Sequence, residues 1–137
     1  MRQIILDTET SGLDFEKDRI IEIGCLELID GVYTGKKYHR YYRPDNILIS
    51  QESQNIHGLD NEFLSKFESF DRKIEDFLLF INNSQMIIHN AQFDLNMINQ
   101  SLKNSSFLLF KASFSISVQC VFIFGSPPFL IDSIHNK

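Results

Sequence analysis

The sequence has few cysteines, little basic charge and no long apolar run. Its two cysteines, Cys25 and Cys120, lie far apart and form no C-x-x-C pair, which argues against a zinc site and a disulfide framework. Asp7 and Glu9 interrupt the first apolar run, so we expect no secretory segment there. The late apolar run at residues 121–124 is far too short to span a bilayer. We therefore expect a cytoplasmic protein with no membrane partner.

The length and composition of the chain suit one domain with one hydrophobic core. The chain has 137 residues, of which 43% are apolar and 23% are charged, as is typical of a globular protein. Its net charge is −5, whereas a protein that grips duplex DNA alone usually carries a basic face. The only basic cluster contains Lys36, Lys37, Arg40 and Arg43. If the substrate is a nucleic acid, we expect the chain to hold only a short stretch of it.

The order of the predicted elements indicates an α/β protein with a mixed sheet covered by helices. Three strands near residues 3–6, 20–29 and 33–43 are joined by short turns, so the sheet is expected to begin antiparallel. A short helix capped by Asp60 follows. Apolar residues at helical spacing then predict a longer helix; they are Phe70, Ile74, Phe77, Leu78 and Ile81. A strand at residues 86–89 and an amphipathic helix near Asp94 complete the pattern.

Residues 107–137 differ in character from residues 1–106. They contain six phenylalanines and only three charged residues, whereas the first 106 residues carry the other 28 charges. No period of two or 3.6 residues runs through this segment, so its phenylalanines are not expected to reach one core face. We therefore predict a folded core in residues 1–106. The tail, residues 107–137, is predicted to be aberrant or divergent and the least ordered part of the chain.

Asp7 and Glu9 form the first candidate site. Residues two apart on a strand point to the same side, so the D-T-E sequence would offer two carboxylates to one point. Such groups repel each other unless a cation joins them, and hard oxygen ligands suit Mg²⁺ or Mn²⁺. The alternative is an acidic strand-to-turn junction in which Asp7 only caps the turn. On this short motif alone, the alternative is favoured.

Two further polar segments are candidates. Asp94 would lie in the first turn of a helix, where negative charge is favoured; the alternative is that Asn90 and Asp94 only cap that helix. Glu52 and His57 lie in a segment that is otherwise interpreted as a polar loop with a turn glycine, Gly58. Taken alone, each segment favours its structural interpretation.

Together, the order and spacing of these segments match one family. The chain resembles the DEDD-type 3′–5′ exonucleases, which have a ribonuclease H-like fold, and among them the epsilon proofreading subunits of bacterial DNA polymerase III. The matching segments are residues 7–14 (DTETSGLD), 20–24 (IIEIG), 42–44 (YRP), 56–59 (IHGL), 62–64 (EFL) and 87–94 (IIHNAQFD). The resemblance covers the chain from its first residue to about residue 103.

This resemblance implies hydrolysis of the 3′-terminal phosphodiester of single-stranded DNA by two metal ions. Asp7 would bridge two Mg²⁺ or Mn²⁺ ions, Glu9 would bind one of them, and Asp94 would bind the other. These three residues are thus the expected catalytic residues and metal ligands. The expected substrate-binding residues are Asp7, Glu9, Glu52 and His57.

The sequence departs from the family after Asp94. The family supplies a late histidine, as general base, five residues before a metal-binding aspartate. No such pair follows Asp94, and His135 has no acidic residue after it. A general base contributes roughly 10²–10⁴-fold in rate, so we expect slow or absent turnover. Our hypothesis is that a frameshift or gene decay replaced the C-terminal third; the alternative is a divergent tail that still folds.

Two other functions are kept as alternatives. An RNA-processing exonuclease of the same superfamily shares the fold, metals and reaction, although the I-H-G-L segment and the E-F-L that follows favour the polymerase subunit. A chain without turnover could instead only bind metal or a partner. The resemblance also implies core subunits of polymerase III as partners of the intact family, bound through a C-terminal region. These 137 residues have no counterpart of that region, so the partnership of this chain is left open.

Overall fold

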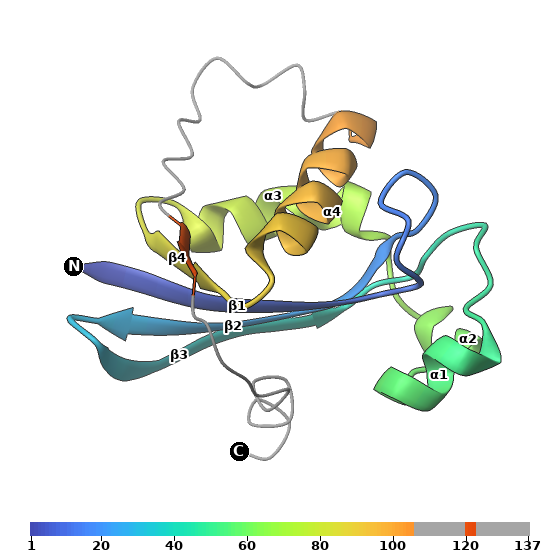
Figure 1. Cartoon of the computed structure of the whole chain (residues 1–137), viewed down its shortest axis with the longest axis horizontal. Helices are drawn as coiled ribbons and strands as arrows, with labels where there is room; N and C mark the ends of the chain where they lie inside the picture. Colours follow the sequence, from blue (N-terminus) through green and yellow to red (C-terminus); the bar gives the residue numbers. More distant parts are fainter. Residues whose placement is uncertain (106–119, 123–137) are drawn as a thin grey trace.

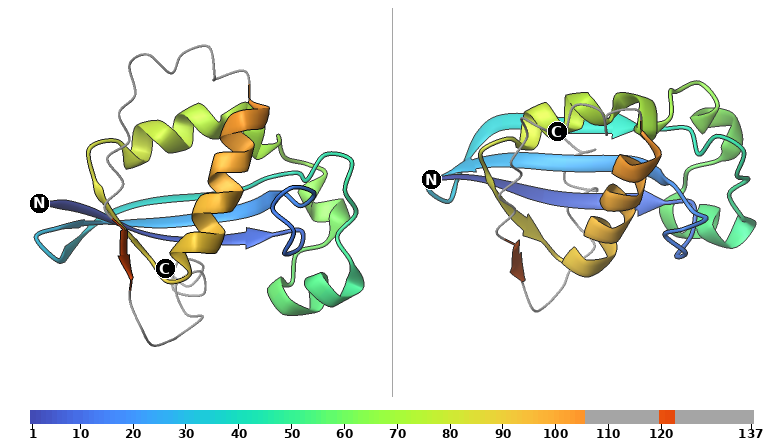
Figure 2. Two further views of the ribbon diagram at one scale, coloured as in Figure 1. Left: turned by 45° about the horizontal axis from the view of Figure 1, so that its top comes forward. Right: turned by 90° about the horizontal axis from the view of Figure 1, so that it is seen from above.

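The computed structural model describes residues 1–105 and 120–122. They form a five-stranded mixed sheet in the order β3-β2-β1-β4-β5, with helices α3 and α4 on one face (Figures 1 and 2). The strands are β1 (Arg2–Thr10), β2 (Ile20–Ile29), β3 (Val32–Tyr41), β4 (Gln85–Ile88) and β5 (Cys120–Phe122). The helices are α1 (Gln51–His57), α2 (Asn61–Leu64), α3 (Phe70–Ile81) and α4 (Ala91–Asn104). This arrangement confirms the predicted α/β class and the antiparallel start of the sheet.

The first three strands form a continuous antiparallel meander. β2 has the predicted bounds, whereas β1 is longer than predicted because its pairing with β2 continues to Thr10. Asp30 and Gly31 turn the chain into β3 with φ angles of 50° and 82°, the left-handed values that a two-residue hairpin needs. The acidic D-T-E motif, residues 7–9, pairs with β2 along its whole length. It is therefore part of a strand and not a junction that only caps a turn.

The core lies between this meander and the two long helices. α3 buries its predicted apolar stripe, in which Phe77 and Leu78 are completely enclosed. Leu6 of β1 and Met97 of α4 belong to the same cluster. Each such side chain contributes about 1.5–3 kcal/mol by leaving water, so this layer holds both helices against β1.

Residues 51–57 form a helix, α1, where the sequence predicts a polar loop. The hydroxyl of Ser50 accepts the N–H of Ser53 at 3.1 Å and caps the first turn. Gly58 ends the helix with a φ of 75°, a value that a residue without a side chain adopts easily. These two caps make a helix of seven mainly polar residues. The loop prediction was wrong because this helix has no apolar stripe that a sequence pattern could reveal.

The remaining short elements connect the meander to α4. α2 is capped as predicted, since the Asp60 side chain accepts the N–H of Phe63 at 2.7 Å. β4 pairs parallel with β1, and β5, which we did not predict, pairs parallel with β4. The prediction of disorder in the rest of residues 107–137 lies outside the described residues. No helix in the described part of the chain is both long and apolar enough to cross a membrane.

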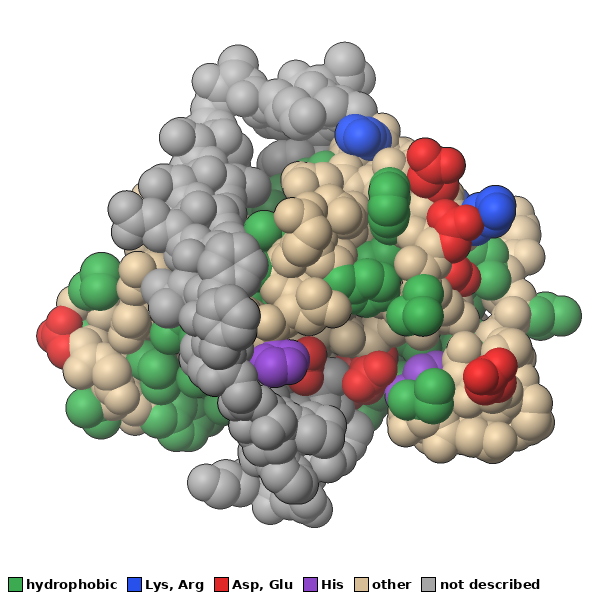
Figure 3. Space-filling view, in the orientation of Figure 1, with side chains coloured by type: hydrophobic (Ala, Val, Ile, Leu, Met, Phe, Trp, Pro, Cys, Tyr) green, Lys and Arg blue, Asp and Glu red, His purple; other side chains and the backbone are tan. Residues whose placement is uncertain are grey.

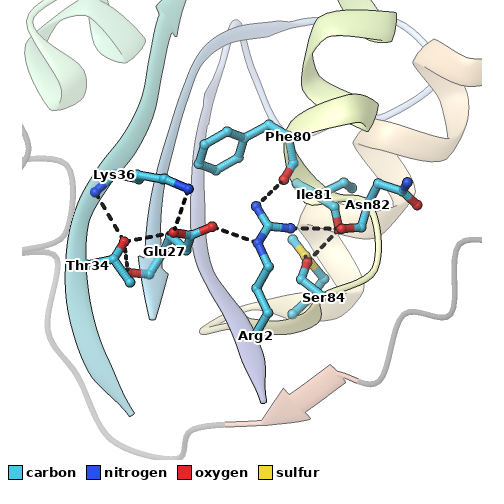
Figure 4. Close-up of polar contacts among 9 residues, drawn as sticks. Arg2, Glu27, Thr34, Lys36, Phe80, Ile81, Asn82 and Ser84 are labelled. Atoms are coloured by element: carbon cyan, nitrogen blue, oxygen red, sulfur yellow. Dashed lines mark hydrogen bonds and ion pairs between the residues drawn. The ribbon is translucent and has the colours of Figure 1, made fainter. Parts of the chain in front are cut away.

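A network of charges ties the N-terminal end of β1 to α3 (Figure 4). Arg2 Nε donates to the Glu27 carboxylate at 2.7 Å, and the other two guanidinium nitrogens donate to the carbonyl oxygens of Phe80 and Asn82. The Thr34 hydroxyl donates to the same carboxylate at 2.8 Å. Paired charges and hydrogen bonds therefore hold this end of the sheet.

Candidate active site

β1 presents two different sets of side chains by simple alternation. Leu6, Thr8 and Thr10 are buried, and Leu6 packs into the core beneath the helices. Asp7 and Glu9 alternate with them and are half-buried. Since successive residues of a strand point to opposite faces, the strand directs Asp7 and Glu9 to the same side of the sheet.

Asp94 reaches β1 from the first turn of α4. Its Oδ1 accepts a hydrogen bond from Thr8 Oγ1 at 2.6 Å, and the residue is only 4% exposed. Asn90, which precedes the helix, makes no side-chain capping bond, so capping by Asn90 does not account for this segment. The contact anchors the Asp94 carboxyl group to the residue that lies between Asp7 and Glu9 in the sequence.

Burial changes the acidity of two of these groups. Burial and the charge of nearby Asp7 raise the pKa of Asp94 to about 6, although the Thr8 hydroxyl opposes the rise. Burial also raises the pKa of Asp7, and the charge of Glu22 adds to that effect. Buried carboxyl groups that disfavour each other's charge are stabilised by a cation. Their oxygen donors fit Mg²⁺ or Mn²⁺.

These carboxylates do not form a ready-made metal cluster. Within residues 1–105 and 120–122, no group of three or more His, Cys, Asp or Glu side chains is placed to hold a metal ion. The assignment of Asp7, Glu9 and Asp94 as metal ligands therefore stays a prediction. Figure 3 shows acidic and histidine side chains near one another in the middle of one face, below the two long helices.

Glu22 of β2 lies beside this site and was not among the predicted site residues. It is 1% exposed, and His39 Nε2 of β3 lies 2.6 Å from its Oε1. The register of β1 and β2 places Glu22 directly opposite Glu9. The sequence conceals Glu22, because a glutamate in a strand normally faces solvent.

His57, the last residue of α1, carries a buried donor that has no partner in the part of the chain that the structure describes. Its Nδ1 accepts the N–H of Leu59 at 3.1 Å, so the proton of the neutral ring lies on Nε2. Nε2 is buried and has no hydrogen-bond partner among the described residues. Burial lowers the pKa of His57, and the charge of Glu22 partly offsets this effect. His57 is therefore within electrostatic reach of Glu22, and its contact with a substrate stays a prediction.

Glu52 lies on the same helix, but its side chain is exposed. α1 is placed beside the loop that follows β1, because Ser53 Oγ donates to the carbonyl oxygen of Ser11 at 3.4 Å. This contact brings α1 to the end of the strand that carries Asp7. A contact between Glu52 and a substrate stays a prediction.

The chain is similar in sequence to known nucleases. The family model RNase_T, described as an exonuclease, matches residues 4–123. The DNA polymerase III subunit epsilon of Buchnera aphidicola subsp. Schizaphis graminum is 47% identical over 104 residues, which make up 72% of this chain and 44% of that protein. The chain thus spans less than half the length of this relative.

Solved structures show a similar arrangement. Exonuclease X in complex with 5′-overhanging duplex DNA matches with a TM-score of 0.56 and 30% identity, over 69% of this chain and 52% of that chain. Exonuclease I matches with a TM-score of 0.68 and 16% identity, over 74% of this chain and 24% of that chain. At so low an identity, the second likeness concerns the fold alone, and it confirms the predicted ribonuclease H-like sheet.

Proposed function

Because this chain belongs to the exonuclease family, we propose that it hydrolyses the 3′-terminal phosphodiester of single-stranded DNA, as a proofreading exonuclease does in DNA replication. The hydrogen bond between Thr8 and Asp94 supports this most. It brings a buried carboxyl group to the strand that carries Asp7 and Glu9. The charge of Asp7 also acts on Asp94, so a strand and a helix bring two carboxyl groups near each other, which suits a nuclease that uses divalent cations.

We assign Asp7, Glu9 and Asp94 as ligands of two Mg²⁺ or Mn²⁺ ions. When bound, the ions would activate a water molecule and stabilise the leaving oxygen. Asp7, whose charge already acts on Asp94, would contact both ions. The Thr8 hydroxyl holds the Asp94 carboxyl group by Oδ1 and so fixes the group that would bind a cation. Glu9, which lies on the same face of β1 as Asp7, would complete the set of ligands.

His57 would bind the terminal nucleotide as a hydrogen-bond donor. Its Nε2 is buried without a partner in the described part of the chain, and leaving such a group unpaired costs about 1–3 kcal/mol. A phosphate or sugar oxygen of the 3′ nucleotide would supply the acceptor. Glu52, from the exposed side of α1, would contact the same nucleotide.

Turnover by these 137 residues is expected to be slow. No histidine followed five residues later by an aspartate occurs after Asp94, and a general base contributes roughly 10²–10⁴-fold in rate. The similar protein from Buchnera is a subunit of DNA polymerase III. Other subunits of that polymerase are therefore the protein partners to test first.

A labelled-oligonucleotide assay tests the proposal. The chain is incubated with 5′-labelled single-stranded DNA in Mg²⁺, Mn²⁺ or EDTA, and the expected result is a metal-dependent ladder that shortens from the 3′ end. Asp7→Asn is expected to abolish the ladder. Glu27→Gln, a change at the far end of the sheet, is the matched control and is expected to keep it.

The same assay separates the alternatives. Cleavage of an RNA oligomer at an equal or higher rate would favour an RNA-processing exonuclease. Binding of Mn²⁺ and DNA without nucleotide release would favour a chain that only binds. A folded chain that binds neither Mn²⁺ nor DNA would contradict the proposal.

A further inference from the structure

The basic cluster at residues 36–43 has no role in the proposed reaction. It lies on β3, the outer strand of the sheet, and continues just past the end of that strand. Three tyrosines stand between its cations. Interleaved basic and aromatic side chains are typical of surfaces that hold single-stranded nucleic acid, and here they occur in a chain whose net charge is −5.

A cavity of about 340 Å³ lies where β3 meets α3 and the loop between α2 and α3. Its basic lining residues are Arg40 of β3, Lys66 of the loop and Lys73 of α3. Tyr41 and Phe67, both half-buried, also line it. This volume is at the lower end of those that bind small ligands, so the cavity suits a ligand of the size of one nucleotide.

The positive charge of the cavity is largely available to a ligand. Lys66 and Lys73 are exposed and form no ion pair within residues 1–105 and 120–122. Two carboxylates, those of Glu68 and Asp76, also line the cavity. Glu68 lies 3.4 Å from Arg72, a cation outside the lining. The surroundings of the cavity therefore keep a positive balance that favours an anionic ligand.

Packed aromatic rings form one wall of the cavity. The ring centroids of Tyr41 and Phe67 lie 5.6 Å apart, and Phe63 packs edge to face against the two rings at 5.0 and 5.1 Å. The Arg40 guanidinium lies over the ring of Tyr38, 5.4 Å from its centroid. These contacts hold the rings in place, so a base can stack on the wall without first ordering it.

Tyr41 connects the cavity to the candidate active site. Its side chain hydrogen-bonds Glu22, and Glu22 is opposite Glu9 in the register of β1 and β2. A DNA strand whose 3′ end lies at Asp7 and Glu9 would therefore reach the cavity if it leaves the site across Tyr41.

We propose that this cavity is a second contact for single-stranded DNA and holds one nucleotide on the 5′ side of the terminal one. Lys66 and Lys73 bind the flanking phosphates, and the aromatic wall stacks the base. This inference rests on the proposed function. A segment of an acidic protein would also satisfy the lysines, but it would leave the aromatic wall without a planar partner, so DNA is favoured.

Comparing a short and a long strand tests this contact. Binding to the whole chain is measured in Mn²⁺ by fluorescence anisotropy, with phosphorothioate linkages at the 3′ end that keep the labelled strands from being shortened. A dinucleotide reaches only the active site. A strand of about 12 nucleotides, within the range of known single-strand sites, also reaches the cavity. The unaltered chain is expected to bind the longer strand more tightly.

Two sets of variants remove this advantage in different ways. Lys66→Gln combined with Lys73→Gln is expected to weaken binding of the longer strand alone. The slope of its log affinity against log salt concentration is expected to fall by about 1.4, the value for two lost phosphate contacts. Phe67→Leu keeps an apolar side chain but removes the ring, and it is expected to weaken the longer strand by about fivefold or more. Circular dichroism checks that each variant is folded.

Lys36→Gln is the matched control. Lys36 is an exposed lysine of the same strand, but it pairs with Glu27 at 3.7 Å and lies outside the cavity. Its affinity for both strands is expected to equal that of the unaltered chain. An equal loss in this control, or an equal loss of dinucleotide binding in the double lysine variant, would overturn the inference, because general charge attraction would then explain the binding.

Competitors distinguish the source of the ligand. Polyglutamate carries charge without bases, so it is expected to compete poorly with the longer strand. Competition equal to that of unlabelled DNA of the same charge would overturn the inference in favour of an acidic protein. Thymidine monophosphate is also expected to compete poorly, and equal competition by this free nucleotide would overturn the strand contact.

The outcomes separate the two levels of the proposal. If the unaltered chain binds neither strand, the proposed function fails and the inference fails with it. If the chain binds both strands with equal affinity, and Asp7→Asn weakens both equally, the proposed site stands and the second contact alone is overturned.

Discussion

The two ends of β1 place carboxylates in opposite surroundings. At the N-terminal end, Arg2 and Thr34 donate to Glu27 and lower its pKa. At the other end, burial raises the pKa of Asp7 and Asp94. A carboxylate with a cationic partner from the chain strengthens the fold. A pair of buried carboxylates that oppose each other's charge is typical of a functional site.

Among the substitutions that test this comparison, Asp7→Asn is expected to have the largest effect. The rate of 3′ nucleotide release is expected to fall by about 10²–10³-fold, the range for losing one group that stabilises transition-state charge. Mn²⁺ affinity is expected to fall with it, because Asp7 is assigned to both ions. Initial rates at saturating Mn²⁺ measure the effect. A folded variant that keeps most of the rate would refute the assignment.

Asp94→Asn is expected to stabilise the metal-free chain at neutral pH by up to about 3 kcal/mol. The pKa of Asp94 is about 6 in the fold and 3.8 in the unfolded reference. Between these values the folded state binds more protons, so stability of the unaltered chain falls as the pH rises through this window. Because asparagine does not ionise, the variant is expected to lack this decrease in stability with rising pH. Urea unfolding from pH 4 to 8 measures it, and parallel pH curves would contradict the expectation.

Thr8→Val is expected to destabilise the chain at pH 7 by about 1–3 kcal/mol, because it removes the hydroxyl donor of the buried Asp94 carboxyl group. Thr10→Val is the matched control. Thr10 Oγ1 donates to the neutral carbonyl oxygen of Gly12 at 2.6 Å, and a bond of this kind contributes about 0.5–1.5 kcal/mol. Urea unfolding measures the free energy of unfolding of both variants. An equal decrease in the two would show that the bond to Asp94 stabilises the chain no more than a bond to a neutral carbonyl oxygen does.

Arg2→Met is expected to have the smallest effect on the candidate site. It removes the bonds to the Glu27 carboxylate and to the carbonyl oxygens of Phe80 and Asn82, so the free energy of unfolding is expected to fall by about 1–3 kcal/mol. Mn²⁺ affinity is expected to stay the same, because this network lies at the opposite end of β1. Thermal unfolding and a Mn²⁺ titration measure the two quantities. Weaker Mn²⁺ binding would mean that the two ends of the strand are coupled.

The elements with a strong apolar period were predictable from the sequence. The stripe that includes Phe77 and Leu78 predicted α3, and Asp30 with Gly31 predicted the hairpin between β2 and β3. α1 was missed because its helix depends on caps at Ser50 and Gly58. β5 was missed because three residues show no period, and their strand exists only through pairing with β4.

The candidate site was predictable in its acidic residues but not in the residues that support them. Alternation along a strand places Asp7 and Glu9 on one face, and the family resemblance adds Asp94. The partners of these residues come from elsewhere in the chain. The contact between His39 and Glu22 spans 17 positions of sequence. Only the strand register, which a single sequence does not reveal, brings such residues together.

The parallel pairing of β1 with β4 has a consequence for folding kinetics. It comprises four residue pairs that begin at Gln3↔Gln85, and contacts between segments so distant in sequence tend to form slowly. α4 follows β4 directly, so Asp94 reaches Thr8, 86 positions away, only when this pairing has closed. A slip of one residue would displace β4 by about 3.3 Å along β1 and separate the two groups. Cation binding is therefore expected to appear with the slowest folding phase, so that a metal titration during refolding reports when the sheet has reached its correct register.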